Sequence, residues 1–393
     1  MRSLIRDNRD LRVDFFRGYA LFCIFVGHIP DHQLWVVTIQ VLGPSDATEA
    51  FVFLAGFSAA FAYGRAWERS GWAYAAFAVL QRVWTLYLVH IFMFLAFIGQ
   101  VSWSTTRFAN PAYLDEVNIG GFLQEMHVAV LDALSLRLQP AFMDILPLYI
   151  VVLAIFAVLL PLLRWPWLLL AVSGAGWLLV RVTRFNLATA HGDWFFNPLA
   201  WQFLFIIGVA MARLGPEARA WFTRWRQPLL AGAIVVAVAG LLVSAVWRLG
   251  PIYDLLPDSL AQPIYTRIDK AGLHPVRLLH FLALAYLASR LVPPGAAWLL
   301  SVPAQPFTLC GQHGLVVFAL GVFLSFVGRL VMQEIDTTLP TQLAIALGGW
   351  AICCGFAALQ AWHDNRGSKA GGGSKPGPRT ALATIARTDS KAA

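Results

Sequence analysis

Charged side chains are scarce in this sequence and make up only 13% of its 393 residues. Soluble domains carry about 25% charged residues, so the composition argues against a soluble protein. Apolar residues account for 59% of the chain. They gather in runs of about 20 residues, the length that a helix needs to cross a bilayer. The sequence therefore predicts an integral membrane protein with many crossings.

Cysteine is also rare, and its four copies form no metal-binding pattern. No CxxC occurs, and all four cysteines fall in or beside apolar runs: Cys23, Cys310, Cys353 and Cys354. Free cysteines are among the most buried residues of proteins, so we predict buried free thiols. No metal is expected at these positions.

Two further absences concern targeting and transport. No small-residue cleavage site follows the basic N-terminus, so a cleavable signal peptide is not predicted. No internal repeat resembles the inverted halves from which many transporters are built. The first apolar run is therefore expected to remain as a membrane helix.

The net charge of +8 might suggest binding to nucleic acid. That interpretation fails, because the Lys and Arg residues lie in short loops between apolar runs and in the C-terminal tail. Such placement is typical of the charge bias that orients membrane proteins. We expect the lipid bilayer as a partner, and no nucleic acid.

The apolar runs predict an all-α, polytopic fold of about ten transmembrane helices. A basic N-terminus (1–13) precedes the transmembrane domain (14–362), and a disordered tail rich in Gly, Ser, Lys and Ala (363–393) follows it. With both termini in the cytoplasm, the basic loops all fall on the cytoplasmic side. The predicted spans are 14–32, 48–66, 74–99, 142–163, 165–183, 198–214, 227–248, 274–292, 311–332 and 340–361.

The first span carries ionisable residues that a membrane helix should avoid. Arg17 and His28 are eleven residues apart, which is three turns plus about 20°, so they share one helix face about 16 Å apart. Asp14 lies one turn before Arg17 on nearly the same stripe. Ionisable groups at membrane depth are costly, so this face is a candidate functional site.

The second span begins with two carboxylates, Asp46 and Glu49, at about the depth of His28. A short connection between the two spans makes them antiparallel neighbours. A pair between His28 and either carboxylate is therefore expected, and it would fix the imidazole in one tautomer and raise its basicity.

Further polar residues punctuate the other spans at many depths, a pattern that suits a ligand threaded through the bundle or an ion path. They are Arg82, His90, Asp144, Asn197, Gln202, Arg277, His280 and His313.

Structural roles compete with functional ones at these positions. Arg17, Arg82 and Arg277 could be anchors that reach the membrane surface. His28 could be an interfacial residue, and Asp46 and Asp144 could cap their helices. Three more histidines could join helices by hydrogen bonds: His90, His280 and His313.

The arrangement of these residues resembles the membrane-bound acyltransferase 3 superfamily. Arg17 and His28 match its R-x10-H pattern, and residues 51–57 (FVFLAGF) resemble its FxFLSGF motif, with Ala55 in place of Ser. The chain is still more similar to the OpgC branch over about residues 6–362. The segments that carry this likeness are 12–18 (RVDFFRG), 45–54 (SDATEAFVFL), 143–149 (MDILPLY), 196–202 (FNPLAWQ), 277–286 (RLLHFLALAY) and 310–315 (CGQHGL).

The resemblance implies a ten-helix enzyme of the bacterial inner membrane. It would move a succinyl group from cytoplasmic succinyl-CoA to hydroxyls of osmoregulated periplasmic glucans, with His28 as the catalytic histidine. Glu49 and Asp46 would orient His28. The other expected site residues fall into two groups, the donor side with Arg17, Asp14, Arg82 and His313, and the acceptor side with Asp144, Asn197, Gln202, Arg277 and His280. The cations expected to read a succinyl carboxylate are Arg277, Arg181 and Arg184.

Several alternatives stay open from the sequence. The donor could carry an acetyl or other acyl group, and the acceptor could be another envelope polysaccharide or a lipid-linked sugar. A direct transfer and an acyl-histidine relay fit equally well. Outside the enzymes, a transporter or flippase and a non-catalytic envelope partner remain. The oligomeric state is undetermined, a homodimer being one option.

Overall fold

The fold is built almost wholly of helices, as the apolar periodicity predicts. The computed structural model describes residues 1–6, 9–119, 125–190, 192–248, 257 and 268–370. Within that part of the chain, sheet is confined to a short antiparallel hairpin, β1 (Ala188–Thr189) and β2 (Gly192–Asp193). The all-α class is therefore confirmed.

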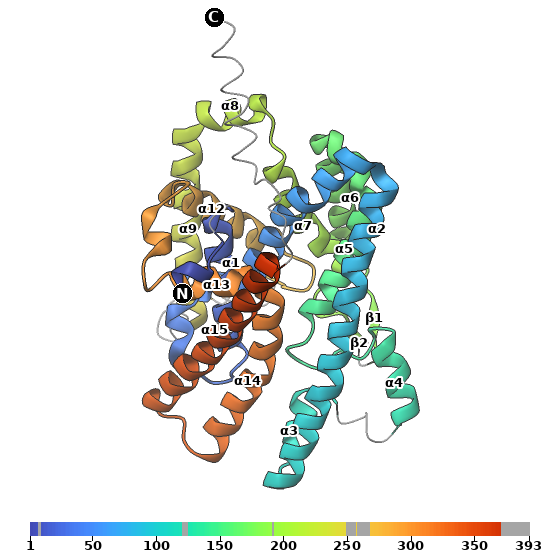
Figure 1. Ribbon diagram of the computed structural model, residues 1–393, viewed down its shortest axis with the longest axis vertical. Helices are drawn as coiled ribbons and strands as arrows, with labels where there is room; N and C mark the ends of the chain where they lie inside the picture. The colour runs from blue at the N-terminus through green and yellow to red at the C-terminus, as the bar shows by residue number, and fades with distance from the viewer. Residues whose placement is uncertain (7–8, 120–124, 191, 249–256, 258–267, 371–393) are drawn as a thin grey trace, which may run out of the picture.

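The helices lie in two groups side by side (Figure 1). One group contains α2 (Ala47–Phe108), α5 (Ile145–Leu159), α6 (Pro166–Thr183) and α7 (Pro198–Ala212). The other contains α1 (Leu11–Gly27), α9 (Arg226–Arg248), α12 (Pro275–Leu291), α13 (Gln305–Gln312), α14 (Gly314–Glu334) and α15 (Leu339–Ala370). Helix α1 connects the two groups, because it packs against α2 as well as against α13 and α14.

Shorter helices and 3-10 segments precede, connect or follow these helices. They are α3 (Ala112–Glu116), α4 (Met126–Leu134), α8 (Pro216–Arg224) and the 3-10 segments Arg2–Leu4, Gln33–Val37, Ile39–Leu42, Leu160–Arg164 and Ala297–Leu300. In Figure 1, α3 lies at one end of the long axis and α8 near the other.

Six helices of the described chain are long and apolar enough to cross a membrane, or seven if the bent pair α7 and α8 forms one span. Each of the ten predicted ranges overlaps a helix, but α1 and α12 have only 17 residues each. Helix α2 covers two predicted ranges and breaks at Gly71, whose φ of +80° favours glycine. The count of ten crossings and the side of the termini stay predictions.

Glycine pairs bring helix backbones into direct contact within each group. A Cβ at Gly56 of α2 would strike the carbonyl oxygen of Phe205 on α7, and one at Gly208 would strike that of Phe53. Gly18 of α1 and Gly311 of α13 form a second pair of the same kind. Small residues at such crossings are typical of membrane helix packing. The glycine of the FVFLAGF motif thus has a packing role.

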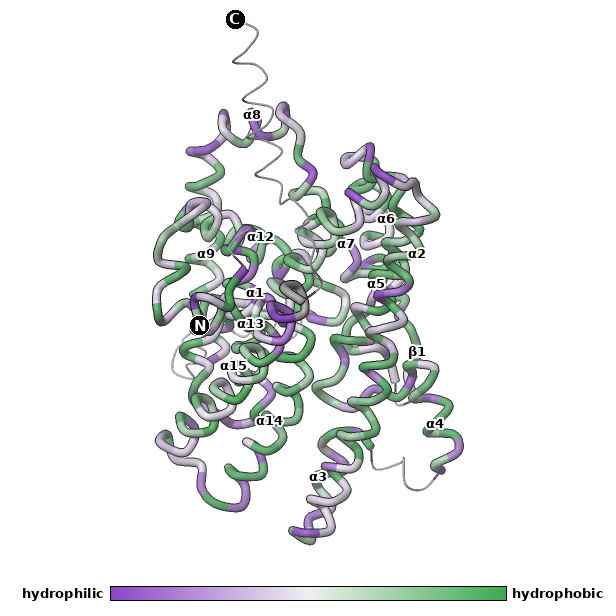
Figure 2. The backbone as a smooth tube through the Cα atoms, viewed as in Figure 1, coloured by the Kyte–Doolittle hydropathy of each residue, from purple (hydrophilic) through white to green (hydrophobic). Residues whose placement is uncertain are grey.

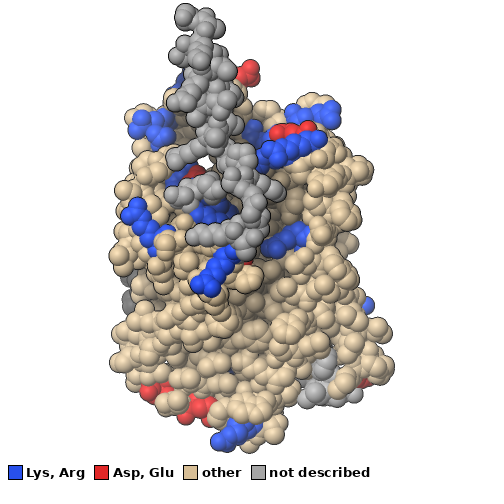
Figure 3. All heavy atoms as spheres, viewed as in Figure 1, with Lys and Arg blue, Asp and Glu red and all other residues tan. Residues whose placement is uncertain are grey.

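Hydropathy and charge are distributed as a membrane protein requires. Figure 2 shows hydrophobic residues along most of the helices and many hydrophilic ones around α8. On the face drawn in Figure 3, most Lys and Arg side chains lie in the upper half, towards the end where α8 is found. Asp and Glu are few on this face, and they are found both in the upper half and at the lower end.

Two other expectations concern the cysteines and the tail. Cys23, Cys310, Cys353 and Cys354 are all free and buried, as predicted. Helix α15 extends to Ala370, through the first residues of the predicted tail. Residues 371–393 lie outside the described chain, so disorder there stays a prediction.

Candidate functional site

His28 follows the last residue of α1 and caps the helix through its backbone. Its amide donates to the carbonyl of Ile24 at 3.0 Å, and its ring lies 5.0 Å from that of Phe142. The ring atom Nδ1 is buried and has no hydrogen-bond partner among the described residues. Buried polar atoms are normally paired, so this nitrogen is open to a ligand, a water or a proton. Lys270 and Asp46 lie close enough for their charges to act on the ring.

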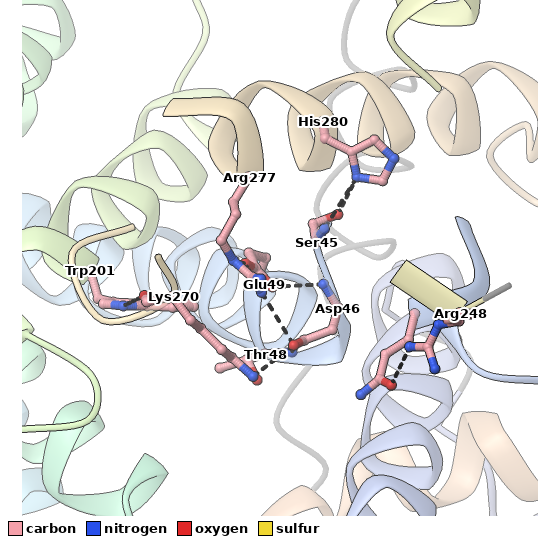
Figure 4. A network of polar contacts seen from close by, with 10 residues as sticks. Ser45, Asp46, Thr48, Glu49, Trp201, Arg248, Lys270, Arg277 and His280 are labelled. Atoms are coloured by element: carbon pink, nitrogen blue, oxygen red, sulfur yellow. Dashed lines mark hydrogen bonds and ion pairs between the residues drawn. The ribbon is translucent and has the colours of Figure 1, made fainter. Parts of the chain in front are cut away.

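The two carboxylates expected beside His28 have other partners (Figure 4). Glu49 is fully buried and accepts from Arg277 Nε at 2.8 Å and Nη2 at 2.7 Å. Asp46 lies 3.2 Å from Arg277 Nη2 and 2.6 Å from Lys270 Nζ. The predicted hydrogen bond to His28 is not among the contacts of the described residues. These carboxylates instead anchor two cations, since an unpaired buried charge is strongly unfavourable.

Asp46 also begins helix α2, as its capping alternative predicted. Its carboxylate accepts the amide of Thr48 at 2.8 Å, while Glu49 accepts the amide of Asp46 at 2.8 Å. This reciprocal capping box satisfies two free donors of the helix start. Local sequence and long-range ion pairs therefore fix the same two side chains.

Lys270 is a site residue that sequence reasoning missed. It lies outside every predicted span, in a loop between α9 and α12. A polar residue in a loop is not unusual, so its sequence position did not mark it as a site residue. Trp201 holds its backbone, donating Nε1 to the Lys270 carbonyl at 3.1 Å, and its ammonium lies 5.3 Å from the centre of the Phe196 ring. The one sequence feature that could have indicated Lys270 is its position just before the polar residues at the start of α12.

Arg17 lies about three turns before His28 on α1, clamped between α2 and α13. Its guanidinium donates to the carbonyls of Gly311 at 3.3 Å and Leu54 at 3.4 Å, and to the hydroxyl of Ser58. Asp14 lies 3.6 Å from it. These contacts hold the Arg17 guanidinium between helices of the bundle.

Asp14 joins the N-terminal segment to α13. Its carboxylate is almost fully buried, pairs with Arg9 at 3.2 Å and accepts from the Gln312 side chain at 3.1 Å. Gln312 also binds the backbone of Arg6. Asp14 therefore fixes α1 against α13.

The remaining donor-side residues are Arg82 and His313. Arg82 is half-buried on α2 and has no ion pair among the described residues, but its charge reaches Tyr63 and Tyr149. Arg17 also acts on Tyr149, so the two arginines face one neighbourhood. His313 lies in the break between α13 and α14, with its Nε2 buried and unpaired within the described chain.

Three of the acceptor-side residues fasten the scaffold. Asn197 caps α7 by accepting the amide of Leu199 at 3.0 Å. Gln202 joins α7 to α6 through Ser173, with bonds of 2.5 and 2.9 Å. His280 bonds the hydroxyl of Ser45 at 2.7 Å and so ties α12 to the segment before α2. His280 thus makes a structural hydrogen bond, but to a residue that precedes α2 and not to another helix.

Asp144 and His90 behave differently. Asp144 stands at the start of α5 without a capping hydrogen bond from its side chain, and the charge of Lys270 reaches it. His90 is fully buried with neither ring nitrogen paired among the described residues, so its predicted hydrogen bond to another helix is absent from that part of the chain.

The geometry separates two polar centres along α1. One is the Arg17 clamp, and the other holds His28 with the cluster of Asp46, Glu49, Lys270 and Arg277. Among the described residues no group of three or more His, Cys, Asp or Glu side chains could hold a metal ion. An unpaired imidazole beside a charged cluster can accept and return a proton, which is the chemistry of a general base.

Comparison with known proteins assigns the chain to a family. No curated protein and no solved structure matches it. A model of the family described as OpgC protein matches residues 9–365, nearly the whole chain. That match supports a membrane-bound acyltransferase role of the OpgC type, directed at a glucan. The protein is a member of the OpgC family.

Proposed function

We propose that this protein moves a succinyl group from cytoplasmic succinyl-CoA to hydroxyl groups of a periplasmic glucan, with His28 as general base. The observation that carries the proposal is the buried Nδ1 of His28, which has no partner among the described residues. His28 follows the last residue of α1, about three turns after Arg17. An acyl donor bound along this helix would place its two ends at these two centres.

The proposed reaction needs one proton carrier. Neutral His28 removes the proton from a glucan hydroxyl while the oxygen attacks the thioester carbonyl. The carbon–sulfur bond then breaks, and the imidazolium returns its proton to the departing CoA thiolate. The ammonium of Lys270 opposes the positive charge that develops on His28, while the carboxylate of Asp46 favours it. In the relay alternative, His28 itself carries the acyl group between the two substrates.

The donor side of the proposal rests on cations near the cytoplasmic end. CoA carries several phosphates, and Arg binds phosphate through charge-assisted hydrogen bonds. Arg17 is already engaged by protein oxygens, so Arg82, which has no ion pair among the described residues, is the freer phosphate ligand. Arg17 then supports the passage of the pantetheine arm between α1 and α2.

The succinyl carboxylate needs a cation near His28. Arg277 is paired with two carboxylates and is only 6% exposed, so it has little capacity left for a ligand. Lys270 has three donors, one ion pair to Asp46 and a side chain that is 27% exposed. We therefore infer that Lys270, rather than Arg277, reads the free carboxylate of the donor.

A purified-protein assay tests the proposal. Protein in detergent is mixed with succinyl-CoA and unsubstituted periplasmic glucan, and the glucan is analysed by mass spectrometry. Wild-type protein is expected to add acidic succinyl esters. General-base catalysis contributes about 10²–10⁴-fold, so His28→Ala should lose at least about a hundredfold in rate.

The matched control is His127→Ala, which removes an exposed histidine on α4. It should retain wild-type activity. An acetyl-CoA arm separates the donors, because an acetyl ester adds no charge. Retained activity in His28→Ala would refute the base assignment, and neutral esters alone would refute the succinyl donor.

A further inference from the structure

A polar hollow of about 780 Å³ opens beside the end of α6. Its volume falls within the range of about 300–1,000 Å³ that is usual for small-molecule sites. The hairpin, the start of α7 and the loop before α12 enclose it. Residues that line it include Arg181, Arg184, Phe185, Asp193, Asn197 and Asp269.

The hollow shares a strip of backbone with the His28 site. Asp269, Ala271 and Gly272 line the hollow, whereas the side chain of Lys270 between them reaches Asp46 at 2.6 Å. The amide of Asn197 donates to the Ala271 carbonyl at 3.1 Å and holds this strip against α7. A ligand in the hollow would therefore lie one strip of backbone away from the Lys270–Asp46 pair.

The chemistry of the lining suits a neutral, hydroxyl-rich ligand. Arg181 is neutralised by Asp269 at 2.6 Å, while Arg184 and Asp193 have no ion pair among the described residues. The lining thus offers donors and acceptors in balance, which disfavours a phosphate ligand. A sugar hydroxyl both donates and accepts, so it can use either sign.

An aromatic ring adds an apolar surface beside these polar groups. Phe185 lines the hollow and is 54% exposed, so its apolar ring is accessible to a ligand. Sugar rings present C–H faces that pack on aromatic rings, while their hydroxyls reach the neighbouring polar side chains. A polar rim with one exposed ring is the combination that a sugar unit fits.

We propose that this hollow binds glucose units of the glucan acceptor and directs one of its hydroxyls towards His28. The inference rests on the proposed function and adds the place where the acceptor is held. Arg184 and Phe185 provide the hydrogen bonds and the stacking surface, and neither belongs to the catalytic cluster.

Two substitutions in the hollow test the inference. Arg184→Asn removes the cation while tolerating the left-handed backbone at φ +56°, and Phe185→Leu removes the ring while keeping an apolar side chain. Binding of unsubstituted glucan to the full-length protein is measured by calorimetry, and the KM for glucan and for succinyl-CoA in the transfer assay. We expect glucan affinity to fall about tenfold in Arg184→Asn and about threefold in Phe185→Leu, with the KM for succinyl-CoA unchanged.

A second Arg-Phe dipeptide elsewhere in the chain supplies the matched control variants. Arg107 and Phe108 end α2 outside the hollow, so Arg107→Asn and Phe108→Leu should bind glucan as the wild type does. If wild-type protein acylates glucan and both hollow variants bind it normally, the acceptor site is refuted while the proposed function stands. If wild-type protein neither binds nor acylates glucan, the proposed function fails and the inference fails with it. Should Arg184→Asn not fold, Phe185→Leu against Phe108→Leu decides.

Discussion

At the scale of single residues, the charged cluster at the start of α2 explains how costly groups are kept inside the bundle. Glu49 has no exposed surface, and Arg277 compensates its charge with two donors. Asp46 has two cations, Arg277 and Lys270. Removing Arg277 would therefore leave Glu49 without a cation. Removing Lys270 would leave Asp46 still paired with Arg277.

This difference predicts an order of stability losses. Arg277→Ala leaves Glu49 buried without its cation and should lower the free energy of unfolding by about 3–5 kcal/mol. Lys270→Ala leaves Asp46 paired with Arg277, so we expect a loss nearer 1 kcal/mol. Thermal unfolding in detergent measures both, with exposed Arg107→Ala as the control. Equal losses for Lys270→Ala and Arg277→Ala would contradict the cluster's arrangement.

The same residues show which parts of the site can be predicted from the sequence. Charge in an apolar run drew attention to Arg17, His28, Asp46 and Glu49, and all four lie at polar centres. Their partners could not be assigned, because Arg277 and Lys270 are over 220 residues away from Asp46 along the chain. Only the fold brings α12 and its preceding loop against the start of α2.

At the scale of elements, direct backbone contact sets the positions of α1, α2, α7 and α13. The ninth predicted span begins at residue 311, whereas α14 starts at Gly314 after a break at His313. Helix α13 has eight residues and packs along α1 through Gly18 and Gly311. Hydropathy alone does not reveal it, because a window of membrane length averages the short helix with its neighbours.

The crossing of α2 and α7 predicts opposite effects for two glycines on one helix. Gly56→Ala places a methyl group against the carbonyl oxygen of Phe205 and should lower the free energy of unfolding by about 1–3 kcal/mol. Gly99 has open space around it, so Gly99→Ala should stabilise α2 by about 0.5–1 kcal/mol. Thermal unfolding of the two variants separates packing from helix propensity. A stabilised Gly56→Ala protein would mean that the helices do not touch there.

At the scale of the whole molecule, the loops predicted to share a membrane side meet in space. Arg6 pairs with Asp364 at 2.8 Å, so the N-terminal segment lies against the end of α15. Arg213 pairs with Glu68 at 2.5 Å. Arg213 lies at the predicted cytoplasmic end of the sixth span, and Glu68 lies in the loop predicted as cytoplasmic after the second span.

The loops predicted as periplasmic meet likewise. The hydroxyl of Tyr113 donates to Glu334 at 2.5 Å. Arg181, at the predicted periplasmic end of the fifth span, pairs with Asp269 at 2.6 Å. On the face drawn in Figure 3, Lys and Arg lie mostly in the upper half. The orientation predicted from the sequence is therefore consistent with these contacts, while the sides themselves stay predictions.

An assay in sealed vesicles tests the central claim, which is acyl transfer from one face of a membrane to the other. The protein is reconstituted into vesicles that contain unsubstituted glucan, and its termini are located with a C-terminal tag and external protease. Succinyl-CoA is then added outside, and the enclosed glucan is analysed by mass spectrometry. Vesicles with outward-facing termini should accumulate acidic succinyl esters inside, and His28→Ala vesicles should not. Esters that form only when donor and glucan share one side, or none at all with wild-type protein, would contradict the account.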